Sequence, residues 1–177
     1  MKIAYTLLAT SMLLASCATP KPEEADLVLL YTTDLHGACL PFDFKKNQPA
    51  NISLANVCTY VEQQRQEHPE AVMLFDTGDF LQGQPSIYYS NFVDTTDTHI
   101  MAEVFNYLKY DAVGVGNHDI ETGEDVYERR LPGQFQMPWI CANAIDQRTG
   151  QPMFEPYTVI ERQGVKVAVL GMITPHI

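Results

Sequence analysis

Short apolar runs alternate with amphipathic stretches along most of the chain. Residues 27–33, 71–75 and 112–116 are apolar runs of strand length, and we expect each to form a β-strand. The stretches 52–67 and 98–110 place apolar side chains at helical spacing, which predicts two surface helices with one buried stripe each. The unbroken run 27–33 is typical of a strand that is covered on both faces. Alternating strands and helices indicate an α/β architecture with parallel strands.

The last third of the chain changes character. Residues 137–144, 154–161 and 165–173 have the composition of strands, and turn sequences rather than helices separate them. We therefore expect hairpins that extend the sheet. With 177 residues in all, the sequence predicts one folded domain over residues 27–177.

The N-terminus, "MKIAYTLLATSMLLASC", has an early lysine, an apolar run and small residues before Cys17. This pattern is typical of a signal peptide and is too short to span a membrane as a mature helix. Small residues before a cysteine resemble the lipobox of bacterial lipoproteins. We expect residues 1–16 to be a lipoprotein signal peptide, Cys17 to carry lipid, and residues 17–26 to form a tether. The protein would then be exported and lipid-anchored in the bacterial cell envelope, on the periplasmic or surface side.

The formal net charge of −11, from 11 basic and 22 acidic side chains, argues against binding to nucleic-acid polymers. A small anionic substrate would need local positive charge, such as metal ions. The remaining cysteines lack the paired spacing of a zinc site; they are Cys39, Cys58 and Cys141. We expect them to be buried and to act as small hydrophobic side chains. A disulfide between two of them is also possible, and the sequence does not say which two. His68 and His99 lie near predicted helix ends, where we expect both to be solvated.

Polar residues follow each of the first three predicted strands, in "TTDLHG", "DTGDFLQG" and "GNHDIETG". The carboxyl ends of parallel strands meet at one edge of a sheet, so we expect these three loops to converge. Carboxylate, imidazole and amide groups together suit first-row divalent metals. Individually, the Asp and Asn residues are also good turn formers and helix caps. The candidate residues in these loops are Asp34, His36, Asp76, Asp79, Asn117, His118, Asp119 and Glu121.

The three loops resemble the first three motifs of calcineurin-like metallophosphoesterases. The nearer match is the 5′-nucleotidase and UDP-sugar hydrolase branch, which shows "TTDxHG", "GDxxQG" and "GNHEFDxG". Phosphoprotein phosphatases instead carry an Asp-Arg pair after the second motif, so Gln82 and Gly83 disfavour that class. The likeness runs from about Leu27 to Pro175, through "CANAIDQRTGQPMFEPY" and "VKVAVLGMITP". It implies an α/β fold, a four-layer sandwich of two mixed sheets flanked by helices, of which this chain holds the incomplete N-terminal portion.

The resemblance also implies roles for single residues. Asp34 and His36 would bind one of two divalent metal ions (Zn, Mn, Fe or Co), and Asp79 would bridge the pair. Asn117 would bind the second ion, and His118 would be the catalytic imidazole that faces the substrate. The branch orients this histidine with an Asp, and Glu121 stands in that place here. The implied reaction is two-metal hydrolysis of phosphate esters of nucleotides or related small molecules.

Several alternatives stay open. Sites of this family also take histidines from two later motifs that the sequence does not include, so the other candidate is a truncated, non-catalytic envelope lipoprotein that keeps part of a metal site. We expect Asp76 to have a structural hydrogen-bonding role and Asp119 to cap the next helix. Asn143 would fix a turn or line the pocket. Three aromatic residues are expected in the core or on the surface rather than at the substrate: Tyr88, Tyr89 and Phe92.

Overall fold

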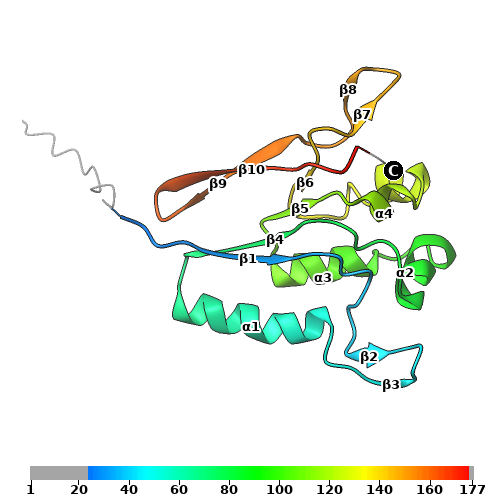
Figure 1. Ribbon diagram of the computed structural model, residues 1–177, viewed down its shortest axis with the longest axis horizontal. Helices are drawn as coiled ribbons and strands as arrows, with labels where there is room; N and C mark the ends of the chain where they lie inside the picture. Colours follow the sequence, from blue (N-terminus) through cyan, green and yellow to red (C-terminus); the bar gives the residue numbers. More distant parts are fainter. Residues whose placement is uncertain (1–23, 176–177) are drawn as a thin grey trace, which may run out of the picture.

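A computed structural model describes residues 24–175, so the predicted signal peptide, Cys17 and most of the predicted tether lie outside the described residues. Its main sheet has four parallel strands in the order β1-β4-β5-β6 (Figure 1). The strands are β1 (Val28–Thr32), β4 (Val72–Asp76), β5 (Ala112–Gly114) and β6 (Trp139–Ile140). The predicted α/β architecture with parallel strands is confirmed, and three of these strands lie within a residue or two of their predicted bounds.

The two predicted helices are present as α1 (Leu54–Glu67) and α3 (Ile100–Leu108), and both lie on the same side of the main sheet (Figure 1). Each buries the apolar stripe that its sequence spacing predicts, with Leu54 and Val61 inward on α1 and Met101 and Phe105 inward on α3. The Arg65 guanidinium donates hydrogen bonds to the carbonyls of Leu108 and Lys109, at 2.7 and 2.9 Å. It thereby satisfies carbonyls that the end of α3 leaves without helical partners.

An aromatic core extends from α3 to the loop after β4. Phe80 and Phe105 are fully buried and meet edge to face, with ring centroids 5.0 Å apart, and Trp139 packs on Phe80 at 5.7 Å. Leu81 is fully buried as well. The loop that follows β4 is therefore anchored in the core from the residue directly after Asp79.

An antiparallel hairpin of β9 (Tyr157–Arg162) and β10 (Val165–Leu170) lies on the opposite side of the main sheet from the helices (Figure 1). It forms its own two-stranded sheet, so the prediction that hairpins extend the main sheet is wrong. The chain after β10 instead crosses the end of β6, where the Ala142 N–H donates to the Gly171 carbonyl at 2.8 Å. The amide of Asn143 pairs with both backbone groups of Ile173, at 2.7 and 2.9 Å, so this residue fixes a loop as one of its two predicted roles requires.

Strand β1 is covered on one face only. Leu29 and Tyr31 are 58% and 72% exposed, so the prediction that both faces of this strand are buried is wrong. Leu30 packs against the core and lies with Val57 and Val61 of α1. The opposite face of β1 leaves Leu29 and Tyr31 exposed in the part of the chain that the structure describes. A run of apolar residues does not by itself reveal whether a second layer is present.

The remaining elements are short and carry the connections between these layers. The structure also places Tyr88, Tyr89 and Phe92 at the surface, where they are 63%, 54% and 47% exposed. No helix among residues 24–175 is long and apolar enough to cross a membrane. The short elements are β2 (Phe42–Asp43), β3 (Gln48–Pro49), α2 (Pro85–Tyr88), the π-helices η1 (Tyr89–Val93) and η2 (Asp125–Arg130), α4 (Asn117–Ile120), β7 (Ile145–Asp146) and β8 (Gln151–Pro152).

The three cysteines of the described chain are free thiols. Cys39 and Cys141 are buried, as predicted, whereas Cys58 on α1 is partly exposed. Burial raises the pKa of the Cys39 thiol to about 12, so this side chain behaves as a small neutral hydrophobic group.

His99 is fully buried, and the prediction that it is solvated is wrong; His68, at the end of α1, is exposed as predicted. The His99 ring caps α3, because its Nδ1 accepts a hydrogen bond from the Met101 N–H at 3.2 Å. An accepting Nδ1 leaves the proton on Nε2, which donates to the Asn91 Oδ1 at 2.8 Å. Burial lowers the pKa of His99 to about 4, so the ring is neutral in the folded protein at neutral pH.

This burial predicts a pH dependence of stability that a His99→Gln variant should lack. In the unfolded chain His99 takes up a proton near pH 6.5, whereas in the folded protein it stays neutral down to about pH 4. Its contribution to stability is thus complete above pH 6.5 and is lost as the pH falls. The difference in unfolding free energy between wild type and His99→Gln should shrink by roughly 2 kcal/mol from pH 7 to pH 5. Urea unfolding at both pH values measures it, and an unchanged difference would contradict the assignment.

Candidate functional site

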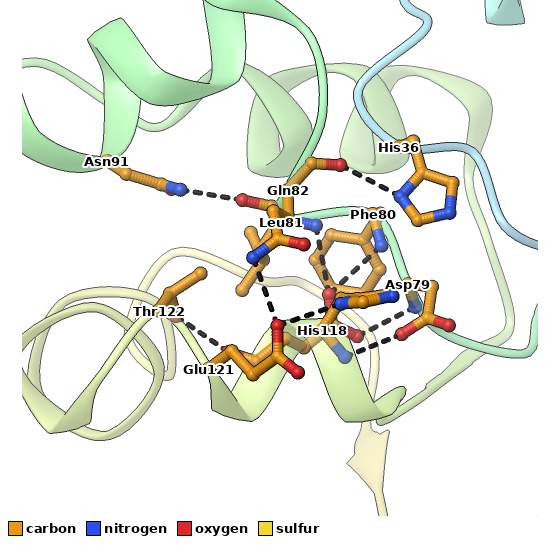
Figure 2. Close-up of polar contacts among 10 residues, drawn as sticks. His36, Asp79, Phe80, Leu81, Gln82, Asn91, His118, Glu121 and Thr122 are labelled. Atoms are coloured by element: carbon orange, nitrogen blue, oxygen red, sulfur yellow. Dashed lines mark hydrogen bonds and ion pairs between the residues drawn. The ribbon is translucent and has the colours of Figure 1, made fainter. Parts of the chain in front are cut away.

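The loops that follow β1, β4 and β5 meet at the carboxyl edge of the main sheet. Main-chain hydrogen bonds join the first loop to the second, from the Asp34 N–H to the Gly78 carbonyl at 3.2 Å and from the His36 N–H to the Asp79 carbonyl at 2.8 Å. The third loop joins them where the His118 N–H donates to the Asp79 Oδ1 at 2.9 Å. The convergence predicted from strand order is therefore present, and Asp79 lies at its centre (Figure 2).

The backbone is strained at three of the four predicted metal ligands. Asp34, His36 and Asp79 have φ angles of 50°, 46° and 64°, in the left-handed region that residues with a Cβ rarely adopt. Such conformations cost on the order of 1 kcal/mol each and persist only where surrounding contacts hold them. Here the main-chain bonds between the loops supply those contacts. Strain of this kind clusters at functional sites, which supports the choice of these residues as candidates.

Two glycines allow the second and third loops to interlock. A Cβ on Gly116 would lie 2.1 Å from the Asp79 Oδ1, and one on Gly78 would lie 2.2 Å from the Gly116 nitrogen. Both distances are far below a van der Waals contact, so any larger residue would separate the loops. The glycines of "TGD" and "GNH" are therefore required by the close approach of two backbones.

Asp119 holds the same two loops together through its carboxylate. The side chain is fully buried, and each oxygen accepts two main-chain hydrogen bonds at 2.8 to 2.9 Å. One bond comes from Gly116 and caps α4, as predicted; the other three come from the loop after β4, at Asp79, Phe80 and Leu81. Burial raises the pKa of Asp119 to about 6, while the four N–H donors favour the ionised form, which predominates at neutral pH.

Asp76 has both carboxylate oxygens engaged within the protein. It accepts a hydrogen bond from the Thr32 hydroxyl at 2.6 Å and another from the Gly78 N–H at 2.9 Å. The Thr32 hydroxyl also lies 2.9 Å from that of Tyr110. Burial raises the pKa of Asp76 to about 7. These contacts support the structural hydrogen-bonding role expected from the sequence.

His118 and Glu121 form an imidazole–carboxylate pair at the open side of the site (Figure 2). The His118 Nδ1 lies 2.9 Å from the Glu121 Oε2, and the two side chains are 36% and 40% exposed. This hydrogen bond raises the pKa of His118 and lowers the pKa of Glu121. Glu121 thus occupies the position of an orienting carboxylate, and the exposed ring can exchange a proton with a bound molecule.

His36 is oriented as a histidine metal ligand would be. Its Nδ1 lies 3.0 Å from the Gln82 main-chain oxygen, and because a carbonyl only accepts, the proton is on Nδ1 and the Nε2 lone pair is free. The ring centroids of His36 and His118 are 5.4 Å apart. Among residues 24–175, however, no three or more His, Cys, Asp or Glu side chains lie close enough to hold a metal ion. The loops converge, but their side chains supply only part of a coordination shell.

Sequence reasoning missed one residue of this site. Gln82 served above only to disfavour a class of phosphatase, yet it contacts both His36 and Glu121 (Figure 2). The signal that could have found it is its place in the motif "GDFLQG", three residues after Asp79 and between two of the converging loops.

Comparisons with known proteins agree with this geometry. No family model matches the chain. A 2′,3′-cyclic-nucleotide 2′-phosphodiesterase/3′-nucleotidase of Yersinia enterocolitica is 32% identical over 90% of this chain and 24% of its own length. A 5′-nucleotidase of Vibrio cholerae is 32% identical over 91% of this chain and 29% of its own. The crystal structure of the calcineurin-like phosphoesterase YfkN from Bacillus subtilis superposes with a TM-score of 0.76 and 28% identity, over 84% of this chain and 48% of that one.

The protein therefore has the calcineurin-like phosphoesterase fold. Its sequence is similar to those of two nucleotide phosphoesterases, which agrees with the resemblance of the three loop motifs. The chain spans about a quarter to a third of the length of these two curated relatives.

The four hydrogen bonds to Asp119 predict a large effect from replacing one of its oxygens by an NH₂ group. In Asp119→Asn the amide NH₂ would face main-chain N–H donors, so at least one buried pair of hydrogen bonds would be lost. We expect a loss of about 3 kcal/mol in unfolding free energy, because each buried unsatisfied group costs roughly 1–3 kcal/mol. Urea unfolding at pH 7 measures it, with Asp97→Asn, an exposed position, as the matched control. Equal stability of the two variants would contradict this role of Asp119.

Proposed function

We propose that this chain is a phosphoesterase that hydrolyses phosphate esters of nucleotides or related small molecules with two divalent metal ions. The observation that carries the proposal is the convergence of Asp79, His36 and the His118–Glu121 pair from three separate loops. The names of the relatives, which are nucleotidases and cyclic-nucleotide phosphodiesterases, support nucleotides as the substrate class.

The donor set fits divalent cations in part. His36 has a free Nε2, and a carboxylate such as Asp79 has more acceptor positions than its one bond from His118 uses. We assign Asp34 and His36 to one ion, Asp79 to both ions and Asn117 to the second. Bound cations of this kind would supply positive charge that attracts a phosphate and polarises its oxygens. Water and the oxygens of the substrate phosphate could fill further coordination positions.

The chain's own residues would carry the proton transfer. The Glu121 carboxylate holds the His118 ring through Nδ1 and raises its pKa, so a protonated ring is favoured. A protonated imidazole facing the substrate can stabilise negative charge on the phosphoryl group and donate a proton to the leaving oxygen. The rigid loops beneath, held by Asp119, would keep this ring in place while the substrate binds.

Hydrolysis of a nucleotide ester with added manganese or zinc tests the proposal. Wild type should release phosphate, and chelation of the metal should abolish the release. His118→Ala should lower the rate by roughly two to four orders of magnitude, the usual worth of a general acid. Asp79→Asn should lower it as well, because it removes charge from the position shared by both ions. His68→Ala, an exposed histidine at the end of α1, is the matched control. Wild type that is no faster than His118→Ala and Asp79→Asn would favour the non-catalytic lipoprotein instead.

We further propose that Cys17 carries a lipid that anchors the protein in the bacterial cell envelope. The support is the apolar run and the small residues before the cysteine, all of which lie outside the described residues. Produced in a bacterial host, wild type should partition into detergent on Triton X-114 phase separation, whereas Cys17→Ser should remain in the aqueous phase. Wild type that stays in the aqueous phase would overturn the anchor without bearing on the hydrolase proposal.

A further inference from the structure

Gln82 contacts His36 through its main chain and, through its side chain, the carboxylate partner of His118. Its main-chain carbonyl accepts the hydrogen bond from His36 Nδ1 at 3.0 Å. Its side-chain Nε2 donates to the Glu121 Oε2 at 3.1 Å (Figure 2). The same Glu121 oxygen is the partner of the His118 ring at 2.9 Å. One residue of the second loop therefore lies between a residue of the first loop and the imidazole–carboxylate pair of the third.

The position of Gln82 is fixed by the main chain on both sides of it. Leu81, directly before it, is fully buried, donates its N–H to Asp119 and accepts a hydrogen bond from the Asn91 amide at 2.6 Å. Gly83, directly after it, has a φ of 133°, and a Cβ there would lie 2.7 Å from the His36 carbonyl oxygen. The Gln84 N–H donates to that same oxygen at 3.0 Å. Although the Gln82 side chain is exposed, its point of attachment is rigid.

A rigid donor matters because Glu121 is itself exposed. An ion pair between two half-exposed side chains is worth little by itself, since the carboxylate can rotate toward solvent. A second hydrogen bond, from an amide whose main chain is fixed, restricts that rotation and favours the Oε2 position that contacts the His118 ring. The group must be a hydrogen-bond donor without negative charge, because a glutamate at position 82 would repel Glu121.

We propose that Gln82 is a positioning residue: its main-chain carbonyl orients His36, and its side-chain amide restrains Glu121 and thereby the His118 ring. This inference rests on the proposed function, because it assigns Gln82 a part in keeping those residues aligned for hydrolysis. The two ends of Gln82 act separately. The carbonyl that orients His36 is main chain, so any residue at position 82 supplies it, whereas the amide that restrains Glu121 is specific to glutamine.

The test compares Gln82→Met, which keeps the length of the side chain but removes the donor, with Gln151→Met, an exposed glutamine on β8, in the full 177-residue chain. The first readout is long-range ¹H–¹⁵N NMR of the histidine rings without metal. We expect the His118 ring signals to move in Gln82→Met, those of His36 to stay, and the unfolding midpoint to match wild type. The second readout is hydrolysis with metal, where kcat should fall about tenfold with KM unchanged.

The outcomes separate the two proposals. If the His118 signals move in Gln82→Met and not in Gln151→Met, the inference is supported, whether or not wild type is active. A wild type that hydrolyses nothing would overturn only the proposed function. If wild type is active and Gln82→Met matches Gln151→Met in both readouts, the inference is overturned and the proposed function stands. A lowered unfolding midpoint together with moved His36 signals would also overturn it, because that pattern reports a loosened loop rather than a lost donor.

Discussion

The geometry of the site depends on one buried carboxylate. Asp119 accepts four main-chain hydrogen bonds, one from the start of its own helix and three from the loop that carries Asp79. These bonds fix two loops that have no other covalent or regular secondary-structure connection at that point. The bonds formed by Asp34 and His36 with Gly78 and Asp79 then attach the first loop to the pair. The backbone of the candidate ligands Asp34, His36 and Asp79 is in this way fixed by hydrogen bonds between the loops.

This arrangement explains why strained and glycine positions occur together. Asp79 has a positive φ, and the Cβ-free backbones of Gly78 and Gly116 lie against it. The hydrogen bonds to Asp119 offset the cost of that conformation, since charge-assisted bonds in a buried setting are among the stronger ones in proteins. The fully buried Phe80 and Leu81 add an apolar anchor directly after the strained residue. Because Phe80 directly follows Asp79, the packing of the core helps to fix the position of this candidate metal ligand.

Sequence patterns predicted the elements whose information is local. The spacing of apolar residues within each segment is enough to predict the helices α1 and α3 and the strands β1, β4 and β5. The ends of those strands then predict where the loops converge. The errors concern partners that are distant in sequence. The sequence around His99 predicts a surface position because it does not reveal that Asn91 accepts a hydrogen bond from the ring. The β9–β10 hairpin was expected in the main sheet because strand composition does not specify which edge a strand joins. The sequence predicts the helix cap at Asp119. It does not predict the three bonds from the loop after β4, because no pattern of residue spacing reports contacts between distant loops.

The carboxylates at the strand ends differ in how far the protein itself satisfies them, and this difference bears on function. Asp76 and Asp119 have both oxygens engaged by internal donors and are buried, so they contribute structure. Asp79 accepts one bond through Oδ1, and a carboxylate offers about four acceptor positions, so most of its acceptor capacity has no hydrogen-bond donor among the described residues. The fold thus holds Asp79 in a strained conformation beside a buried anchor while leaving most of its acceptor capacity unused among the described residues, which distinguishes it from the two structural carboxylates.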